Sequence, residues 1–158
     1  MALSYTVELS EAQLQKKVLA MMPIEKKKLF FTVILSDPEI ELIEGSNEIG
    51  VFTHIEIDSK IGIKGTGRAK ITGSLTYKPD SSEFFFKNTK IEKLEIDKVS
   101  QKYNQQIKAL VQAIGTKVLS SYPVYKLKDD NLKHKLAKAV LQSISVKNKK
   151  LLLKLSVL

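Results

Sequence analysis

The sequence contains no cysteine, and only two of its 158 residues are histidine. The absence of cysteine excludes disulfides, thiolate metal sites and cysteine nucleophiles. His54 and His134 lack the paired spacing of a zinc site, and no G-x-S-x-G motif marks a serine nucleophile. We therefore expect a protein that binds rather than catalyses, with no metal and no cofactor.

Long apolar runs are also missing. No stretch approaches the roughly 18 apolar residues of a transmembrane helix, and Lys154 interrupts the apolar segment 151–158. Residues 1–4 do not begin the basic-then-apolar pattern of a signal peptide. The chain is 43% hydrophobic and 27% charged, as globular proteins are. Its length predicts one domain, residues 1–158, with a hydrophobic core of its own.

Positive charge is concentrated in the C-terminal part of the chain. The formal net charge is −2 over residues 1–97 and +11 over residues 98–158. This imbalance suits an anionic partner such as a phospholipid surface, a nucleic acid or an acidic protein; a solvated lysine-rich face is the alternative. Five lysines are candidate contacts with an anionic membrane surface: Lys126, Lys128, Lys133, Lys135 and Lys138.

Alternating hydrophobicity predicts many strands, the longest from Ile61 to Tyr77. Its odd positions are apolar or small, and its even positions are polar apart from Gly62. Seventeen residues at 3.3 Å each span about 55 Å, so this strand should curve or break near residues 65–67. Shorter strands are predicted over residues 5–9, 29–35, 40–42, 49–57, 84–96 (with a bulge), 124–127, 144–146 and 151–157.

Helical periodicity occurs in three places. Ser10 and Gln13 have the spacing of a capping box, which predicts a helix over residues 11–22. A longer apolar stripe predicts a helix of about 24 residues over 99–122, ended by Pro123. A short basic helix should follow, capped by Asp129, Asp130 or Asn131 and reaching about Gln142. We expect an α+β fold, a long curved antiparallel sheet wrapped around one long helix in the C-terminal half, plus two short helices.

Such a fold can leave an apolar cleft between the helix and the sheet. The stripe is either ordinary core or the wall of a cavity for an acyl chain, and the small residues on the inner sheet face favour the cavity slightly. The candidate ligand-binding residues all carry apolar side chains on these two faces: Ile63, Ile71, Leu75, Ile107, Leu110, Val111, Ile114 and Val118.

Three other patterns favour structural roles. The glycines at 62, 65 and 67 lie inside a strand pattern with no helix after them, which favours strand curvature over a phosphate loop. The acidic residues between 37 and 48 follow strand alternation, as a solvated face does. Phe84 and Phe86 are expected in the core and Phe85 at its rim, and the RNP1 pattern of RNA-binding sheets is absent, so no nucleic acid is expected.

The order and spacing of these segments resemble the YceB-like bacterial lipoproteins over nearly the whole chain. The resemblance rests on residues 5–11, the strand that ends near Tyr77, the Phe-rich hairpin after Pro79-Asp80, the helix over 107–122, and the segments 122–127 and 135–138. It implies a membrane-anchored periplasmic lipoprotein with no assigned activity, similar in fold to the tubular lipid-binding (BPI/SMP-like) superfamily. The signal peptide and lipidated cysteine of that family are not present in this sequence.

Together these observations lead to one main hypothesis and one alternative. The main hypothesis is a non-catalytic periplasmic carrier for an apolar ligand, a lipid or an acyl chain, whose basic C-terminal part faces anionic headgroups. The alternative is an envelope protein–protein interaction module with a fully packed core and a basic docking face. In that alternative, the partner docks on the basic face or on an exposed edge strand near residues 151–157.

Overall fold

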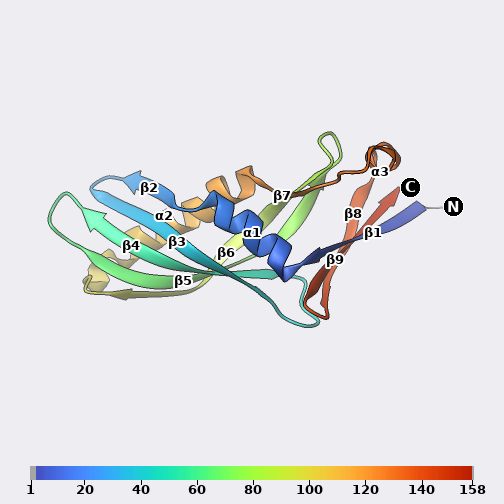
Figure 1. Ribbon diagram of the computed structural model, residues 1–158. Coiled ribbons are helices and arrows are strands. Elements are labelled where there is room, and N and C mark those ends of the chain that lie inside the picture. Colours follow the sequence, from blue (N-terminus) through green and yellow to red (C-terminus); the bar gives the residue numbers. More distant parts are fainter. Residues whose placement is uncertain (1–2, 158) are drawn as a thin grey trace.

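Strands dominate the computed structural model, which describes residues 3–157 (Figure 1). Strands make up 55% of the structure and helices 25%. The protein is therefore mostly β, and the predicted α+β class is wrong. The physical reason is that the strands extend further along the chain than the hydrophobic alternation indicated, while the helices remain short.

A six-stranded antiparallel sheet curls into a half-barrel. Its strands, in spatial order, are β2 (Ile24–Lys28), β3 (Phe31–Leu42), β4 (Ile49–Ser59), β5 (Gly65–Lys78), β6 (Glu83–Asp97) and β7 (Pro123–Lys126). Buried and exposed side chains alternate along the central strands because successive side chains point to opposite faces of a sheet. Strands β2 and β7 are the two open edges of the half-barrel.

Irregular pairing between β5 and β6 accompanies the curl. The register shifts between Lys70 and Ile71 and again between Thr72 and Ser74, which confirms the predicted bulge in the 84–96 segment. The long predicted strand does not begin at Ile61. It begins at Gly65, because the chain turns through residues 60–64. The break expected at Asp37-Pro38 is instead a register shift within a continuous β3.

A second sheet corrects the prediction of a single one. Its three antiparallel strands have the order β1 (Leu3–Ser10), β9 (Lys150–Val157), β8 (Val140–Lys147). Strand β9 therefore lies in the middle, and the exposed edge expected near residues 151–157 is wrong. Leu151, Leu153 and Leu155 are fully buried and join the same hydrophobic core as the half-barrel. One continuous core thus spans both sheets.

The helices are short and irregular. Helix α1 (Glu11–Met21) starts with the predicted capping box at Ser10. The longest helical stretch is only 21 residues. It combines a 3₁₀ turn η1 (Gln101–Tyr103), α2 (Asn104–Ala113), a π turn η2 (Ile114–Val118) and a 3₁₀ turn η3 (Leu119–Ser121). Helix α3 (Asp130–Lys135) is half the predicted length, because β8 already begins at residue 140.

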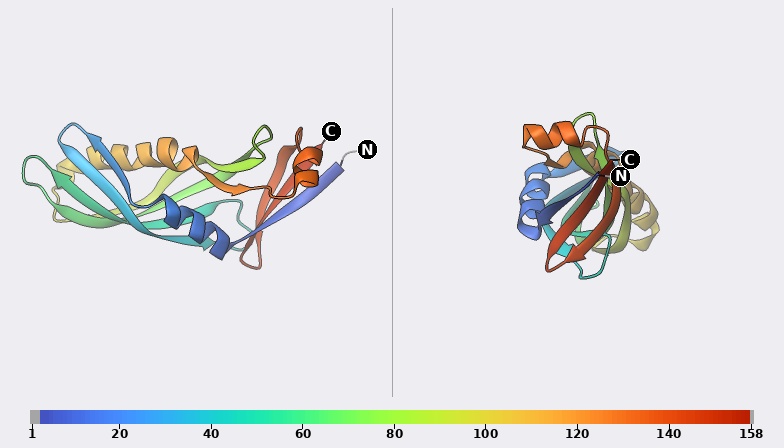
Figure 2. Two further views of the ribbon diagram at one scale, coloured as in Figure 1. Left: turned by 45° about the horizontal axis from the view of Figure 1, so that its top comes forward. Right: turned by 90° about the vertical axis from the view of Figure 1, so that its right-hand side faces the viewer.

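The molecule is elongated and has two distinct ends (Figures 1 and 2). At one end, here called the hairpin end, lie the β2–β3 turn, the β4–β5 turn and the link from β6 to η1. At the other, the C-terminal end, lie the second sheet and α3. The helical stretch 101–121 lines the half-barrel and contacts β2 and β3 on one side and β6 on the other.

Candidate functional site

The predicted ligand-binding residues do come together in space, and most of them are deeply buried. Six of them are at most 2% exposed and belong to the central core: Ile71, Leu75, Ile107, Leu110, Val111 and Ile114. Ile63 and Val118 are half-buried and pack against that core. Ile63 lies in the β4–β5 turn, outside the strand predicted to carry it. A ligand that reaches the fully buried residues must part the helix from the sheet.

The side chain of Gln112 attaches this helix to β6. The Gln112 amide nitrogen donates to the carbonyl oxygen of Thr89 at 2.9 Å, and its amide oxygen accepts from the backbone N–H of Ile91 at 3.3 Å. Both partners flank the irregular part of β6, where the β5–β6 register shifts. Gln112 therefore satisfies backbone groups that an irregular ladder leaves free. Only the tertiary structure identifies this role.

A small hollow, here called the tip pocket, opens at the hairpin end between the β2–β3 turn and α2. Its volume is about 160 Å³. Apolar side chains from both elements form most of its wall, with one lysine and one glutamine at its margin: Lys28, Leu29, Phe31, Gln106, Ala109 and Leu110. Leu110 also belongs to the predicted stripe, so the tip pocket borders the buried face of the helix at this residue.

A larger hollow, here called the inter-sheet groove, separates β5 from β8. Its volume is about 640 Å³, within the usual 300–1,000 Å³ of small-molecule sites. Its lining mixes polar and apolar side chains from β5, β8 and their neighbours: Asn47, Ser74, Leu75, Thr76, Tyr77, Pro79, Lys87, Ala139, Val140, Leu141, Gln142, Ser143 and Ile144. Leu75 is the predicted cavity residue that reaches this groove.

Tyr77 ties the half-barrel to the C-terminal end beside this groove. Its buried hydroxyl donates to the carbonyl oxygen of Leu136 at 2.9 Å. Burial raises the pKa of the Tyr77 hydroxyl above its usual value, and a hydrogen bond with Ser82 offsets part of that rise. Tyr77 therefore stays protonated in the folded protein and remains a hydrogen-bond donor.

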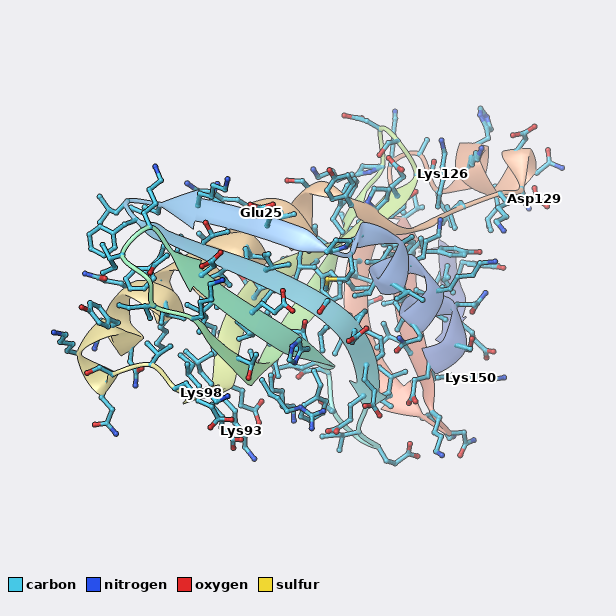
Figure 3. The ribbon with its side chains drawn as sticks, turned by 60° about the vertical axis from the view of Figure 1, so that its left-hand side comes forward. Glu25, Lys93, Lys98, Lys126, Asp129 and Lys150 are labelled. Atoms are coloured by element: carbon cyan, nitrogen blue, oxygen red, sulfur yellow. The ribbon has the colours of Figure 1, made fainter. Side chains whose placement is uncertain are left out.

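The lysines predicted to contact an anionic surface lie at the C-terminal end. Lys126, Lys128, Lys135 and Lys138 are exposed, whereas Lys133 forms an ion pair with Asp130 at 3.7 Å. Figure 3 shows Lys126 on the same side of the molecule as Asp129, the N-cap of α3. The structure thus leaves four of the five lysines accessible to a partner.

Two classes of site find no support among residues 3–157. No group of three or more histidine or acidic side chains there is arranged to hold a metal ion. Within the same residues, no helix has the length and apolar character needed to cross a membrane.

Comparison with known proteins assigns a family without an activity. The family model described as "Protein of unknown function (DUF1439)" matches residues 9–150, which is most of the chain. No curated protein matches the sequence. The matched range includes the half-barrel, the helical stretch and α3.

Proposed function

The chain belongs to this DUF1439 family, and we propose that it is a non-catalytic binding or carrier protein for an apolar ligand, the acyl chain of a lipid. The single observation that carries the proposal is the tip pocket, a mostly apolar hollow that borders the buried stripe of α2 at Leu110. The ligand is a chain rather than a compact molecule, because the pocket is small, about 160 Å³, and the apolar stripe that it borders is long.

The open edges of the half-barrel support this proposal. Strands β2 and β7 do not pair with each other. The helical stretch 101–121 packs against β2 and β3 on one side and against β6 on the other. Apart from the two hydrogen bonds of Gln112 to β6, these contacts are side-chain packing rather than a backbone ladder, so the helix can move outward without breaking hydrogen bonds between strands. A chain of bound methylene groups would replace the side-chain contacts that are lost.

The volume of the tip pocket sets a requirement on binding. At about 160 Å³ it lies below the usual range for a drug-sized ligand, 300 Å³ and above. The pocket must therefore widen when a long chain enters. The π turn η2, where Ile114–Val118 departs from regular helical geometry, is the point at which we expect the helix to yield.

Native mass spectrometry of the freshly purified protein tests this function directly. Lipid adducts that survive purification, or uptake of added oleate, are expected. Ala109→Trp places a large ring at the wall of the tip pocket and should reduce oleate uptake at least about tenfold, the effect of losing 1.4 kcal/mol of binding. Ala137→Trp, an exposed alanine after α3, is the matched control. An apo mass with no uptake would contradict the proposal.

We further propose a periplasmic location with a lipidated N-terminus on a longer native chain, as the resemblance to YceB-like lipoproteins implies. The support is that resemblance, which covers nearly the whole sequence. Fractionation of cells that produce the native precursor should recover the protein with the membranes. Recovery in the cytoplasm would contradict this part of the proposal and leave ligand binding unaffected.

A second candidate function, binding of an extended peptide, is favoured by the free edge of β8. The Val146 N–H donates to Ser46, and the Val146 carbonyl accepts from Gly45, both on the side away from β9. In a strand, the backbone N–H and carbonyl of successive residues point to opposite sides. Those of Ile144 therefore point to the same side as those of Val146, toward the inter-sheet groove that Ile144 lines. A peptide could pair there by strand addition.

Selection of peptides displayed on phage tests this second function. Peptides that bind the protein through β8 should lose affinity for Ile144→Pro, which removes the free donor while leaving the side paired with β9 intact. Ser145→Pro removes a donor on the opposite side and would damage the sheet itself. It therefore serves as the control for misfolding. Peptides that bind Ile144→Pro as well as they bind the unaltered protein would exclude strand addition at β8.

A further inference from the structure

Three turns lie at the hairpin end of the molecule (Figures 1 and 2). They are residues 26–30, 58–64 and 97–103, here called the turn cluster. The Lys60 backbone N–H donates to the Phe30 carbonyl at 3.1 Å, which joins the first turn to the second. The ring of Phe31, next to the first turn, packs edge-on against Tyr103 of the third turn with centroids 5.2 Å apart. The cluster is therefore one continuous surface.

Large apolar side chains project from this surface into solvent. Leu29 is 75% exposed, Ile61 56% and Phe30 36%. Leu29 also has a φ of 58°, a conformation that costs an ordinary residue about 1–2 kcal/mol and favours glycine or asparagine. Neither turn formation nor solvation explains leucine at this position. A residue that is both strained and exposed points to a contact made outside the chain.

The charges around these side chains indicate the chemistry of the contact. The turn cluster contains seven lysines and two aspartates, a formal net charge of +5. Among the described residues, Lys27 is the one lysine of the seven that forms an ion pair, with Glu25 at 3.5 Å. The other six are available to an anionic partner. Figure 3 shows Glu25 and Lys98 on separate parts of this end.

We propose that the turn cluster docks on an anionic phospholipid bilayer, with Leu29, Phe30 and Ile61 inserted among the headgroups and the lysines on the phosphates. Membrane-surface binding depends on buried apolar area together with attraction of basic residues to anionic lipid, and the cluster supplies both. A protein partner would need a matching concave acidic surface; a bilayer needs only projecting apolar tips and positive charge.

Docking in this orientation places the tip pocket at the bilayer. Leu29 belongs both to the turn cluster and to the wall of the tip pocket, so a lipid chain leaving the membrane meets the pocket without crossing water. This route for the ligand rests on the proposed function. The docking itself rests on the turn residues alone, and the two fail separately.

Vesicle co-sedimentation tests the docking. The unaltered protein should bind vesicles of equal parts phosphatidylcholine and phosphatidylglycerol, and bind phosphatidylcholine vesicles much more weakly. The variant Leu29→Ser/Ile61→Ser should lose at least about tenfold in affinity, because two aliphatic side chains no longer leave water. The control Tyr122→Ser/Val140→Ser also removes two exposed apolar side chains, but elsewhere on the molecule. Tyr122 is 54% exposed and Val140 is 55% exposed. It should bind as the unaltered protein does.

Each other outcome overturns the docking. Equal affinity for the two kinds of vesicle, no sedimentation with either, or equal binding by Leu29→Ser/Ile61→Ser would each do so. If Lys135→Glu/Lys138→Glu loses vesicle binding while Leu29→Ser/Ile61→Ser keeps it, the membrane contact lies at the C-terminal end, where the sequence predicted it. The variant Phe30→Ser/Ile61→Ser changes no residue of the tip-pocket wall, and vesicle co-sedimentation together with native mass spectrometry after incubation with oleate separates the two proposals. Retained adducts with lost sedimentation mean that docking and ligand binding are distinct.

Discussion

The hairpin end and the C-terminal end both carry an excess of positive charge but differ in the shape that presents it. The turn cluster has a formal charge of +5, and residues 122–140 at the other end carry five lysines and two aspartates, a formal charge of +3. At the hairpin end, the apolar side chains stand at the apices of turns that contact one another. At the C-terminal end, Val140 lines the inter-sheet groove and Tyr5 lies on β1.

The number of lysines in a segment of the sequence is therefore not enough to locate a membrane-binding surface. Lysine side chains are solvated almost anywhere on a protein surface, and a loose excess of them is compatible with solubility alone. A surface becomes a candidate when projecting apolar groups share it with the charge. The turn cluster brings both together, from three segments of which the first and the last are more than 60 residues apart in sequence.

The largest loss of stability is expected when the half-barrel is disrupted near the hairpin end. A Cβ atom at Gly67 would overlap the backbone carbonyl of Glu95 on β6. Gly67→Ala should therefore cost about 4 kcal/mol of the free energy of unfolding. Gly62→Ala, in open space but at a φ of +84°, should cost about 1 kcal/mol. Urea titrations monitored by circular dichroism compare them, and similar losses would contradict the tight β5–β6 approach.

The two ends of the molecule are expected to unfold together. Ile107→Ala in α2 and Leu153→Ala in β9 each leave a cavity in the shared core, and each should cost about 3 kcal/mol. Differential scanning calorimetry should give one transition for both variants, shifted to lower temperature by similar amounts. Two separate transitions in Leu153→Ala would mean that the second sheet folds independently, and residues 1–158 would not be a single domain.

A smaller effect is expected where Tyr77 joins the two regions. Tyr77→Phe leaves the carbonyl of Leu136 without its donor and should cost about 1.5 kcal/mol. The raised pKa of Tyr77 means that the unfolded chain loses this proton first as the pH rises. The contribution of Tyr77 to the free energy of unfolding is complete at pH values below its ordinary pKa of about 10, and it falls at higher pH. Urea titrations at alkaline pH should show that fall diminished in Tyr77→Phe.

The smallest effect should be a gain, at Thr72 between the two ends. The Thr72 hydroxyl is buried and has no hydrogen-bond partner among the described residues. Thr72→Val replaces it by a methyl group of similar shape and should raise the free energy of unfolding by about 0.5–1 kcal/mol. A loss of stability instead would show that the hydroxyl has a partner, such as a bound water. The conservative exchange Thr72→Ser keeps the hydroxyl and is the control.

Much of the half-barrel could be predicted, because its information is local. Strand alternation over residues 49–57 and 84–96 predicted β4 and β6 closely, and the capping box at Ser10 predicted the start of α1. Strand β2 was missed because its sequence, Ile24–Lys28, is lysine-rich and shows no clear alternation. The apolar site residues were correctly grouped on facing surfaces, but burial, not spacing, decided that most of them lie in a packed core.

Taken alone, the sequence determined the antiparallel character of the main sheet, the apolar stripe of the helix and the absence of cysteine chemistry. These follow from composition and from periods of two and 3.6 residues, which act over a few neighbours. The tertiary structure alone decided that β1 pairs with β9, that Gln112 attaches the helix to β6, and that three distant turns form one surface. Such pairings depend on how the chain closes in space, which no local pattern encodes.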